Sequence, residues 1–322
     1  MTAVVKSLAA SGDLAAHSEF EADVIEGLSR GAKSIPPKYF YDEEGSRLFE
    51  EITRLPEYYP TRTEIDILQA HARDLNAIIP QGAALVEFGS GSCTKVQILL
   101  DNVPAIAAYL PVDISGDFLK CEAERIAQSY PRLSVHPVVA DFTKPFALPE
   151  QFAQMPKTGF FPGSTISNFE PHDAVPFMRN AAQTIGHGGV MVMGVDLVKD
   201  TAMLNAAYND AAGITAKFNL NLLRRINREL DGNFDLRAFE HHAFYNSERR
   251  RIEMHLASTK RQKVSVAGRV FSFRAGETIH TENSYKYTPG SFAALARGCG
   301  WTPEIAWTDP AALFSVNVLR AS

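Results

Sequence analysis

Residues Leu85–Ser92 read LVEFGSGS, and this stretch decides the fold class. Its four largely apolar residues predict a short buried strand, and the sequence up to Leu100 predicts a helix after the glycines. Glycines at such a turn let the backbone approach a ligand closely, and the N–H groups of the helix start point at that ligand. We therefore predict a strand, a ligand-binding loop at Gly89, Ser90 and Gly91, and a helix.

The acidic residues at the ends of the next two predicted strands favour an adenosine ligand without phosphates. Asp113 follows the glycines by about twenty residues, the spacing at which a carboxylate reaches ribose hydroxyls. Asp141 can accept a hydrogen bond from an adenine amine while Phe142 covers the ring. A dinucleotide loop would require a third glycine in place of Thr94, so S-adenosylmethionine is favoured over NAD. Two points stay open: each aspartate alone would also suit a helix cap, and Lys95 is either solvated or a partner for the cofactor's carboxylate.

The sequence around this stretch predicts an α/β fold with a doubly wound, mostly parallel sheet. Further strands are expected, in alternation with helices, at 107–112, 133–139, 163–168 and 189–195. The preceding sequence predicts helices at 18–32, 45–53 and 63–79, with an extended aromatic segment at 35–42. After residue 197 the expected elements are helices at 200–212 and 213–230, an antiparallel meander at 250–275, a helix at 289–297 and strands at 303–307 and 314–319. We expect the N-terminal and inserted segments to form a smaller α+β unit that caps the sheet.

Composition and charge exclude several classes of function. The formal net charge is −5 and no block of five like charges occurs, so we expect no nucleic-acid partner. No window approaches the roughly 20 apolar residues that span a bilayer, and the N-terminus lacks the apolar core of a signal peptide. The 3 cysteines lack metal spacing, which indicates reduced thiols and a cytoplasmic protein. We expect no bound metal, because the histidines that could be ligands show no HxH or HxxxH spacing: His241, His242, His255 and His280.

At this point the sequence resembles the L-histidine Nα-methyltransferases of ergothioneine biosynthesis. The likeness is carried by several segments: Tyr39–Asp42 (YFYD), Leu48–Arg62 (LFEEITRLPEYYPTR), Phe161–Ile166 (FPGSTI), Ala207–Asp210 (AYND), Phe218–Leu230 and Thr281–Ser284 (TENS). The resemblance implies a Rossmann-type methyltransferase domain that binds S-adenosylmethionine, at 61–196 and 286–322. It also implies a smaller α+β domain that binds histidine, at 1–60 and 197–285. The products would be S-adenosylhomocysteine and trimethylhistidine (hercynine), and we expect a monomer that acts on a small molecule.

Matching motifs imply which residues would form the site. The cofactor residues would be Tyr41, Gly89, Ser90, Gly91, Lys95, Asp113, Asp141 and Phe142, with Tyr41 near the methyl group. The histidine residues would be Tyr58, Gly163, Asn168, Tyr208, Met254, Glu282 and Ser284. Asn168 and Tyr208 suit the α-carboxylate and amine, while Glu282 and Ser284 suit the imidazole nitrogens. The catalytic set would be Tyr41, Tyr58 and Asn168. Asn168 and either Tyr58 or Tyr208 would align the amine, and a tyrosine or a water would take the proton.

Some neighbours depart from the family's pattern, and alternative functions stay open. Ser167 and Phe169 stand where Gly and Leu are expected, and Asn283 and Tyr285 flank Ser284, so the shape of the pocket is less secure than its chemistry. Related fungal members methylate a prenylated tryptophan, which makes another amino acid the alternative substrate. A catalytically silent sensor and a dehydrogenase are further alternatives. Two plain roles also stay open: core packing for the tyrosines at 58 and 59, and a surface ion pair with Lys286 for Glu282.

Overall fold

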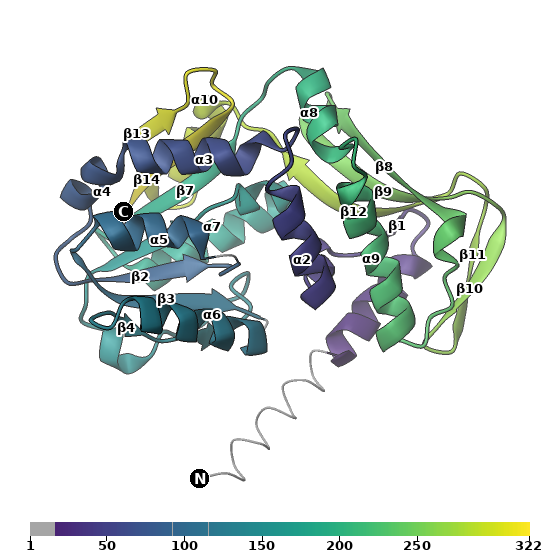
Figure 1. Cartoon of the computed structure of the whole chain (residues 1–322), viewed down its shortest axis with the longest axis horizontal. Helices are drawn as coiled ribbons and strands as arrows, with labels where there is room; N and C mark the ends of the chain where they lie inside the picture. The colour runs from purple at the N-terminus through teal and green to yellow at the C-terminus, as the bar shows by residue number, and fades with distance from the viewer. Residues whose placement is uncertain (1–16, 92, 115) are drawn as a thin grey trace, which may run out of the picture. The chain divides into compact units, whose positions relative to one another are not determined.

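The computed structural model describes residues 17–91, 93–114 and 116–322 (Figure 1). The chain divides into two units. Unit 1 takes in the chain up to Tyr58 together with Thr201–Asn283, and unit 2 comprises Tyr59–Asp200 and Ser284–Ser322. The boundaries expected from the sequence lay at 60/61, 196/197 and 285/286, within four residues of these. Which ligand each unit binds stays a prediction.

Unit 2 contains an 8-stranded sheet in the order β13-β14-β7-β6-β2-β3-β4, with β5 also paired to β3. Its strands are β2 Ala83–Phe88, β3 Ile106–Asp113, β4 Ser134–Val135, β5 Val138–Val139, β6 Lys157–Phe161, β7 Val190–Asp196, β13 Trp301–Thr308 and β14 Phe314–Ala321. The strands from β7 to β4 pair in parallel, whereas β14 is antiparallel to both β7 and β13. The predicted doubly wound, mostly parallel sheet is confirmed.

Helices cover both faces of this sheet, and β2 is apolar at every position except Glu87. Ala84, Val86 and Phe88 belong to one hydrophobic core, while Ala83 and Leu85 belong to the other. Successive side chains of a strand point to opposite faces, so a strand covered on both sides is apolar at nearly every position. The helices of unit 2 are α3 Tyr59–Ala70, α4 Ala72–Ile78, α5 Thr94–Asn102, α6 Gly116–Ser129, α7 Pro171–Ile185 and α10 Pro289–Gly298.

The prediction of a strand at 163–168 is wrong. The strand in this part of the chain is β6, which ends at Phe161, and Thr165–Asn168 form a short 3-10 helix, η3. Gly163 and Ser164 both have positive φ angles, 78° and 57°, so the chain leaves the sheet at once. Ser167 N–H then bonds the Ser164 carbonyl at 2.8 Å and closes the turn. The helix α7 follows at Pro171–Ile185, where the expected alternation of strands and helices had given no bounds.

Unit 1 contains a 4-stranded sheet in the order β1-β12-β9-β8 and a separate hairpin of β10 and β11. The strands are β1 Lys33–Ser34, β8 Phe239–Asn246, β9 Arg251–Ser258, β10 Gln262–Val266, β11 Arg269–Phe273 and β12 Thr278–Tyr285. The meander expected at 250–275 was therefore incomplete, since it lacked β8 and all of β12. The helices are residues 17–29, η1 Pro37–Phe40, α2 Glu43–Ile52, α8 Thr201–Tyr208 and α9 Ile214–Glu229.

The helix α9 packs against strands β8 and β9 and carries a buried asparagine. Asn219 donates to the His255 carbonyl at 3.0 Å and accepts from the Thr281 hydroxyl at 2.8 Å. A buried amide is tolerated only when it is hydrogen-bonded, so these contacts fix α9 on the sheet.

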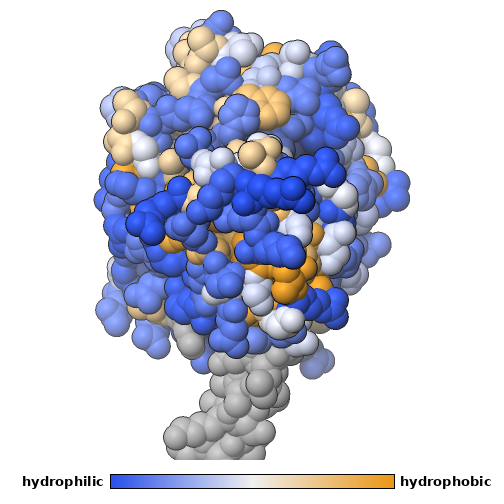
Figure 2. Space-filling model, turned by 90° about the vertical axis from the view of Figure 1, so that its right-hand side faces the viewer, coloured by the Kyte–Doolittle hydropathy of each residue, from blue (hydrophilic) through white to orange (hydrophobic). Residues whose placement is uncertain are grey.

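None of the helices in the described residues combines the length and apolarity that a membrane-spanning helix requires. The face drawn in Figure 2 is mainly hydrophilic, with scattered apolar patches. Such scattered apolar residues are ordinary on a protein surface and identify no docking site.

Candidate functional site

Gly89 and Phe142, two of the predicted cofactor residues, lie against each other at the end of β2. Gly89 has a φ of 75°, and its N–H bonds the Val112 carbonyl at 2.9 Å. A Cβ at Gly89 would lie 3.2 Å from Cε1 of Phe142. Glycine is therefore required here for two reasons, the backbone angle and the closeness of the ring. This edge can hold a flat, uncharged group against the aromatic ring.

Ser90 is buried and its hydroxyl is engaged inside the unit. Its Oγ lies 3.2 Å from the Tyr109 hydroxyl, which in turn donates to the Glu87 carboxylate. Burial raises the pKa of Glu87 to about 7, against the opposing effect of the bonds from Tyr109 and Ser90. Gly91, by contrast, is exposed, and nothing lies within 4 Å of the place its Cβ would take. Of the two, Gly91 has the space around it that a ligand needs.

Asp113 and Asp141 follow the carboxyl ends of two paired parallel strands. Asp113 ends β3 opposite Val139 of β5, and the N–H of Ala140 bonds the Asp113 carbonyl at 3.0 Å. Ligands of doubly wound sheets bind at this edge. Asp141 accepts from the Thr143 N–H at 3.0 Å and its hydroxyl at 2.5 Å. Burial would raise the pKa of Asp141, but the bonds from Thr143 and Lys144 outweigh it and lower the pKa. The helix-cap alternative is wrong for Asp141, since the residues it bonds form a turn and not a helix.

Glu64 joins Lys95 to Gly163, a relationship that sequence reasoning missed. The buried Glu64 carboxylate lies 2.5 Å from Lys95 Nζ and accepts the Gly163 N–H at 2.9 and 3.0 Å. Lys95, expected either in solvent or on the cofactor, is thus held next to the loop expected to bind histidine. The available signal was an acidic residue on the buried face of α3, beside Ile67 and Leu68.

The loop that carries Asn168 is fastened to β7. The Ser164 hydroxyl accepts the Asp196 N–H at 2.8 Å and lies 2.6 Å from the Ser167 hydroxyl. Ser167, one of the departures from the family pattern, therefore holds the turn that precedes Asn168. Phe169, another departure, stacks on Phe177 with ring centroids 5.1 Å apart.

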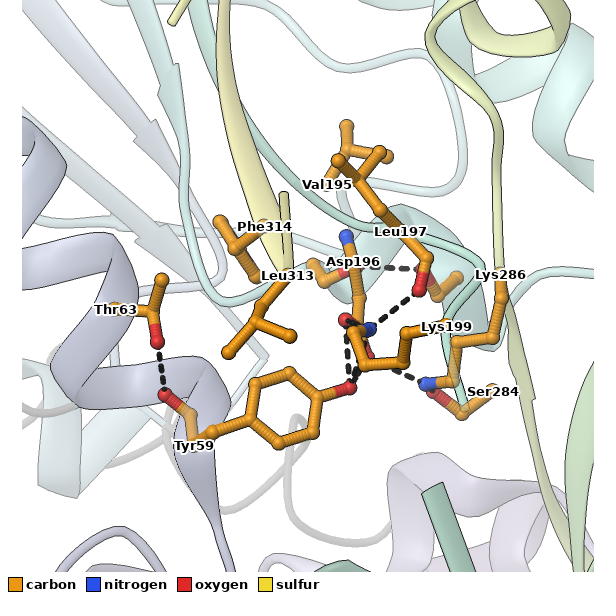
Figure 3. A network of polar contacts seen from close by, with 12 residues as sticks. Tyr59, Thr63, Val195, Asp196, Leu197, Lys199, Ser284, Lys286, Leu313 and Phe314 are labelled. Atoms are coloured by element: carbon orange, nitrogen blue, oxygen red, sulfur yellow. Dashed lines mark hydrogen bonds and ion pairs between the residues drawn. The ribbon is translucent and has the colours of Figure 1, made fainter. Parts of the chain in front are cut away.

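A buried network of ionic contacts surrounds the Asp196 carboxylate (Figure 3). Lys199 Nζ approaches Oδ1 at 2.5 Å, Lys286 Nζ approaches Oδ2 at 2.7 Å, and the Tyr59 hydroxyl donates to both oxygens at 2.8 Å. Burial lowers the pKa of Lys199 to about 8, although Asp196 opposes this. Lys286 also donates to Ser284 Oγ at 2.7 Å, which links the network to a predicted histidine residue. Sequence reasoning missed this network because its members lie far apart along the chain.

The predicted aromatic residues of unit 1 lie in a row of rings. Tyr41 and Tyr58 both contact Phe49 edge to face, with centroids 5.6 and 6.3 Å away, and Tyr208 lies 6.4 Å beyond Tyr58. Gly45 makes the preceding turn possible, because a Cβ there would lie 1.7 Å from the Phe40 carbonyl oxygen. Tyr58 is thus part of an aromatic cluster with two other predicted site residues.

The remaining predicted residues of unit 1 lie in its four-stranded sheet. Met254 is buried in β9, and its carbonyl accepts from the Thr281 hydroxyl at 3.1 Å. Glu282 is buried in β12, with 8 % of its surface exposed. The alternative of a surface ion pair with Lys286 is therefore wrong, since neither residue is at the surface.

The structure also brings together a group that the sequence spacing did not indicate. Ligand atoms of Glu253, His255 and His280 lie within 4.8 Å of one another. Arg251, however, already donates to Glu253 at 2.8 Å. Nε2 of His280 donates to the Glu282 carbonyl, 3.0 Å away, because a carbonyl oxygen can only accept. Burial lowers the pKa of His255 to about 4, so it is neutral at pH 7. We interpret this group as a polar part of the sheet.

The predicted site residues therefore form two groups. Unit 2 holds Gly89, Ser90, Gly91, Lys95, Asp113, Asp141, Phe142, Gly163, Asn168 and Ser284. Unit 1 holds Tyr41, Tyr58, Tyr208, Met254 and Glu282.

Comparison with known proteins found relatives that match nearly the whole chain. A family model described as "Histidine-specific methyltransferase, SAM-dependent" matches residues 20–321. The chain is 41% identical over 325 residues to the histidine N-alpha-methyltransferase of Mycolicibacterium smegmatis, covering 97% of this chain and 99% of that protein. It is 39% identical over 316 residues to the protein of the same name from Mycobacterium tuberculosis, covering 95% and 96%. Ergothioneine biosynthesis protein 1 of Neurospora crassa is 32% identical over 289 residues, which span 86% of this chain and 32% of that protein.

Proposed function

Because this chain belongs to the histidine-specific, S-adenosylmethionine-dependent methyltransferase family, we propose that it methylates the α-amino nitrogen of L-histidine. Three successive transfers would give trimethylhistidine (hercynine) and S-adenosylhomocysteine. The observation that carries the proposal is the family match over residues 20–321, together with 41% identity to a histidine N-alpha-methyltransferase. By the same likeness, we propose that the reaction is the first step of ergothioneine biosynthesis.

The residues at the carboxyl edge of the large sheet fit the cofactor. Gly89 leaves room beside the Phe142 ring, and Asp113 and Asp141 follow the neighbouring strand ends. We assign the adenosine to these residues and the cofactor's amino-acid part to Lys95. Bound there, the cofactor supplies an activated methyl group on a sulfonium.

The protein's own contribution is to bind and orient the amine. The attacking nitrogen must be neutral, with its lone pair directed along the axis of the sulfur–methyl bond. We assign this alignment to Asn168, Tyr58 and Tyr208, with Tyr41 close to the methyl group. Orientation of this kind can lower the barrier by several kcal/mol. Met254 and Gly163 would shape the pocket, while Glu282 and Ser284 would hold the imidazole.

Methyl transfer of this type needs no Lewis acid, because the positively charged sulfur leaves the methyl group as a neutral thioether. We therefore propose a metal-independent enzyme. We also propose that it acts in the cytoplasm, since its cysteines are free, with Cys93 and Cys299 buried and Cys121 exposed. We further propose that it is a monomer.

The test is mass spectrometry of L-histidine incubated with the protein and S-adenosylmethionine. Gains of one, two and three methyl groups, located on the α-nitrogen by fragmentation, are the expected result. A competition among the twenty amino acids then checks the substrate. Methylation of tryptophan in preference to histidine would contradict the proposal.

A further inference from the structure

The carboxylate of Glu64 contacts two predicted ligand residues at once, and all three residues belong to unit 2. Its Oε2 atom lies 2.5 Å from Lys95 Nζ and accepts the Gly163 N–H at 2.9 Å, while Oε1 accepts the same N–H at 3.0 Å. A Cβ at Gly163 would lie 3.4 Å from Lys95 Nζ, so the ammonium lies beside this glycine. We assign Lys95 to the cofactor, and Gly163 opens the turn that leads to Asn168, which we assign to the amine.

The ion pair between Glu64 and Lys95 has one buried and one more accessible partner. The side chain of Glu64 is 1 % exposed, whereas that of Lys95 is 15 % exposed. Removal of the cation from a buried carboxylate is strongly unfavourable, so Lys95 keeps its contact with Glu64 when it binds a second anion. An ammonium has three donors, which is enough to serve both anions. Glu64 thus sets the place of the ammonium that meets the carboxylate of the cofactor.

The turn between Gly163 and Asn168 is stiffened by bonds of its own. The Ser167 N–H bonds the Ser164 carbonyl at 2.8 Å, and the two hydroxyls of these serines lie 2.6 Å apart. Asn168 follows directly as the last residue of η3. A shift of the Gly163 N–H is therefore passed along the turn to Asn168.

We propose that Glu64 is a positioning residue that couples the two ligands, because it holds the lysine for the cofactor's carboxylate and the turn for the histidine amine in one arrangement. This inference rests on the proposed function. A lysine ammonium on its flexible stem has fewer positions between two anions than beside one. Once Lys95 is held in this way, Glu64 and the Gly163 turn are fixed before histidine arrives, so histidine binds at a smaller cost of ordering. Linkage requires that histidine tightens cofactor binding by the same factor.

The test is the coupling factor, which is the Kd of L-histidine without S-adenosylhomocysteine divided by its Kd at saturation with it. Calorimetry on the full chain gives both values, and S-adenosylhomocysteine allows no methyl transfer. The wild-type factor should be about tenfold. Methylthioadenosine has the adenosine and the sulfur but no carboxylate to reach Lys95, so it should give a factor below about threefold.

Variants separate coupling from a general loss of structure. Glu64→Gln keeps the size of the side chain and an acceptor for the Gly163 N–H but loses the charge that holds Lys95, so it should reduce the factor to below about threefold. Ile67→Val, on the same buried face of α3, is the matched control. It loosens the packing without touching a polar contact and should keep the wild-type factor. A purely structural role of Glu64 would change the two Kd values alike and leave their ratio unchanged.

An undiminished factor in Glu64→Gln would overturn the inference, as would an equal loss in Ile67→Val. Should Glu64→Gln fail to fold, the comparison of ligands on the wild type decides, because equal coupling by methylthioadenosine would also overturn the inference. Failure of the proposed function looks different. In that case the wild type binds S-adenosylhomocysteine but does not bind histidine with or without it, and the inference falls with the function.

Discussion

The carboxylate of Glu64 occupies the space that a side chain at position 194 would need. A Cβ on Gly194, in the middle of β7, would lie 2.0 Å from Oε1 of Glu64. The φ angle of Gly194 is not in the left-handed region, so the reason for glycine here is room for a neighbour. One missing methyl group thus allows a buried acid to contact both Lys95 and the Gly163 N–H.

Gly194→Ala should displace Glu64 and destabilise the protein by about 1–3 kcal/mol, because overpacking of a filled interior has that cost. Urea unfolding monitored by circular dichroism measures the change. Gly290→Ala in α10 is the matched control, since nothing lies within 4 Å of its Cβ position. Equal stability of the two variants would show that Glu64 moves aside freely.

Gly89→Ala should weaken binding of S-adenosylmethionine by about tenfold or more, through 1–3 kcal/mol of backbone strain and displacement of Phe142. Calorimetry gives the Kd. Gly82→Ala is the control, because Gly82 has nearly the same φ, 73° against 75°, but no neighbour within 4 Å of its Cβ position. If Gly82→Ala weakens binding as much, the closeness of Gly89 to Phe142 is not the cause.

Glu282→Ala should raise the KM for histidine by about 10- to 100-fold and leave cofactor affinity nearly unchanged. A hydrogen bond to a charged group contributes about 1.5–3 kcal/mol, which corresponds to such a factor. Steady-state kinetics with each substrate varied in turn measures both effects. Glu282→Gln, which keeps an acceptor oxygen, should fall between the wild type and the alanine variant. Equal loss of both affinities would exclude the anchoring role.

The stability of the protein should fall as the pH rises from about 4.5 to 7, in part because of Glu87. Burial raises the pKa of this group to about 7 in the folded protein, from an ordinary value of 4.5. The folded state therefore binds more protons than the unfolded state in this window, and the stabilisation by the neutral carboxyl is lost as the pH rises through 7. The contribution is of the order of 3 kcal/mol.

Glu87→Gln, which stays neutral, should remove this part of the pH dependence in urea unfolding experiments. Glu124→Gln on the surface of α6 is the control and should retain the wild-type slope. An unchanged slope in Glu87→Gln would mean that Glu87 titrates alike in the folded and unfolded states.

Removal of divalent metals with a chelator should change neither the rate of methyl transfer nor the melting temperature. The reaction needs no Lewis acid, and Glu253 is already paired with Arg251. Activity assays and calorimetry after dialysis against EDTA measure both quantities. A loss of activity that Zn²⁺ restores would identify Glu253, His255 and His280 as a metal site.

The sheet of unit 2 could be predicted because its signals are local. An apolar run before Gly89 and aspartates just after later strands indicate parallel strands and their ligand-binding edge without any knowledge of distant contacts. The prediction of a strand at 163–168 failed because the β-branched Thr165 and Ile166 are typical of strands, whereas the positive φ angles of Gly163 and Ser164 turn the chain. The apolar residues just before this region, Phe160 and Phe161, were the better signal for the strand.

The polar networks could not be predicted because they depend on contacts between distant residues. Glu64 meets a backbone N–H that lies 99 residues away, and Lys286 meets a carboxylate 90 residues away. No local pattern in the sequence links residues that lie so far apart. Both networks are therefore apparent only in the folded structure, and the sequence had indicated only three of their members as candidates: Lys95, Gly163 and Ser284.

The position of β14 has a consequence for how the protein is made. This strand lies between β7 and β13, so β7 has an unpaired edge until residues 314–321 have left the ribosome. All segments of unit 1 have been synthesised by residue 283, while the large sheet still lacks two of its strands. A nascent chain stalled between these points would expose a buried, apolar strand edge, the kind of surface on which chains aggregate. The sheet is therefore completed only when β14, the last strand to be synthesised, pairs with β7 and β13.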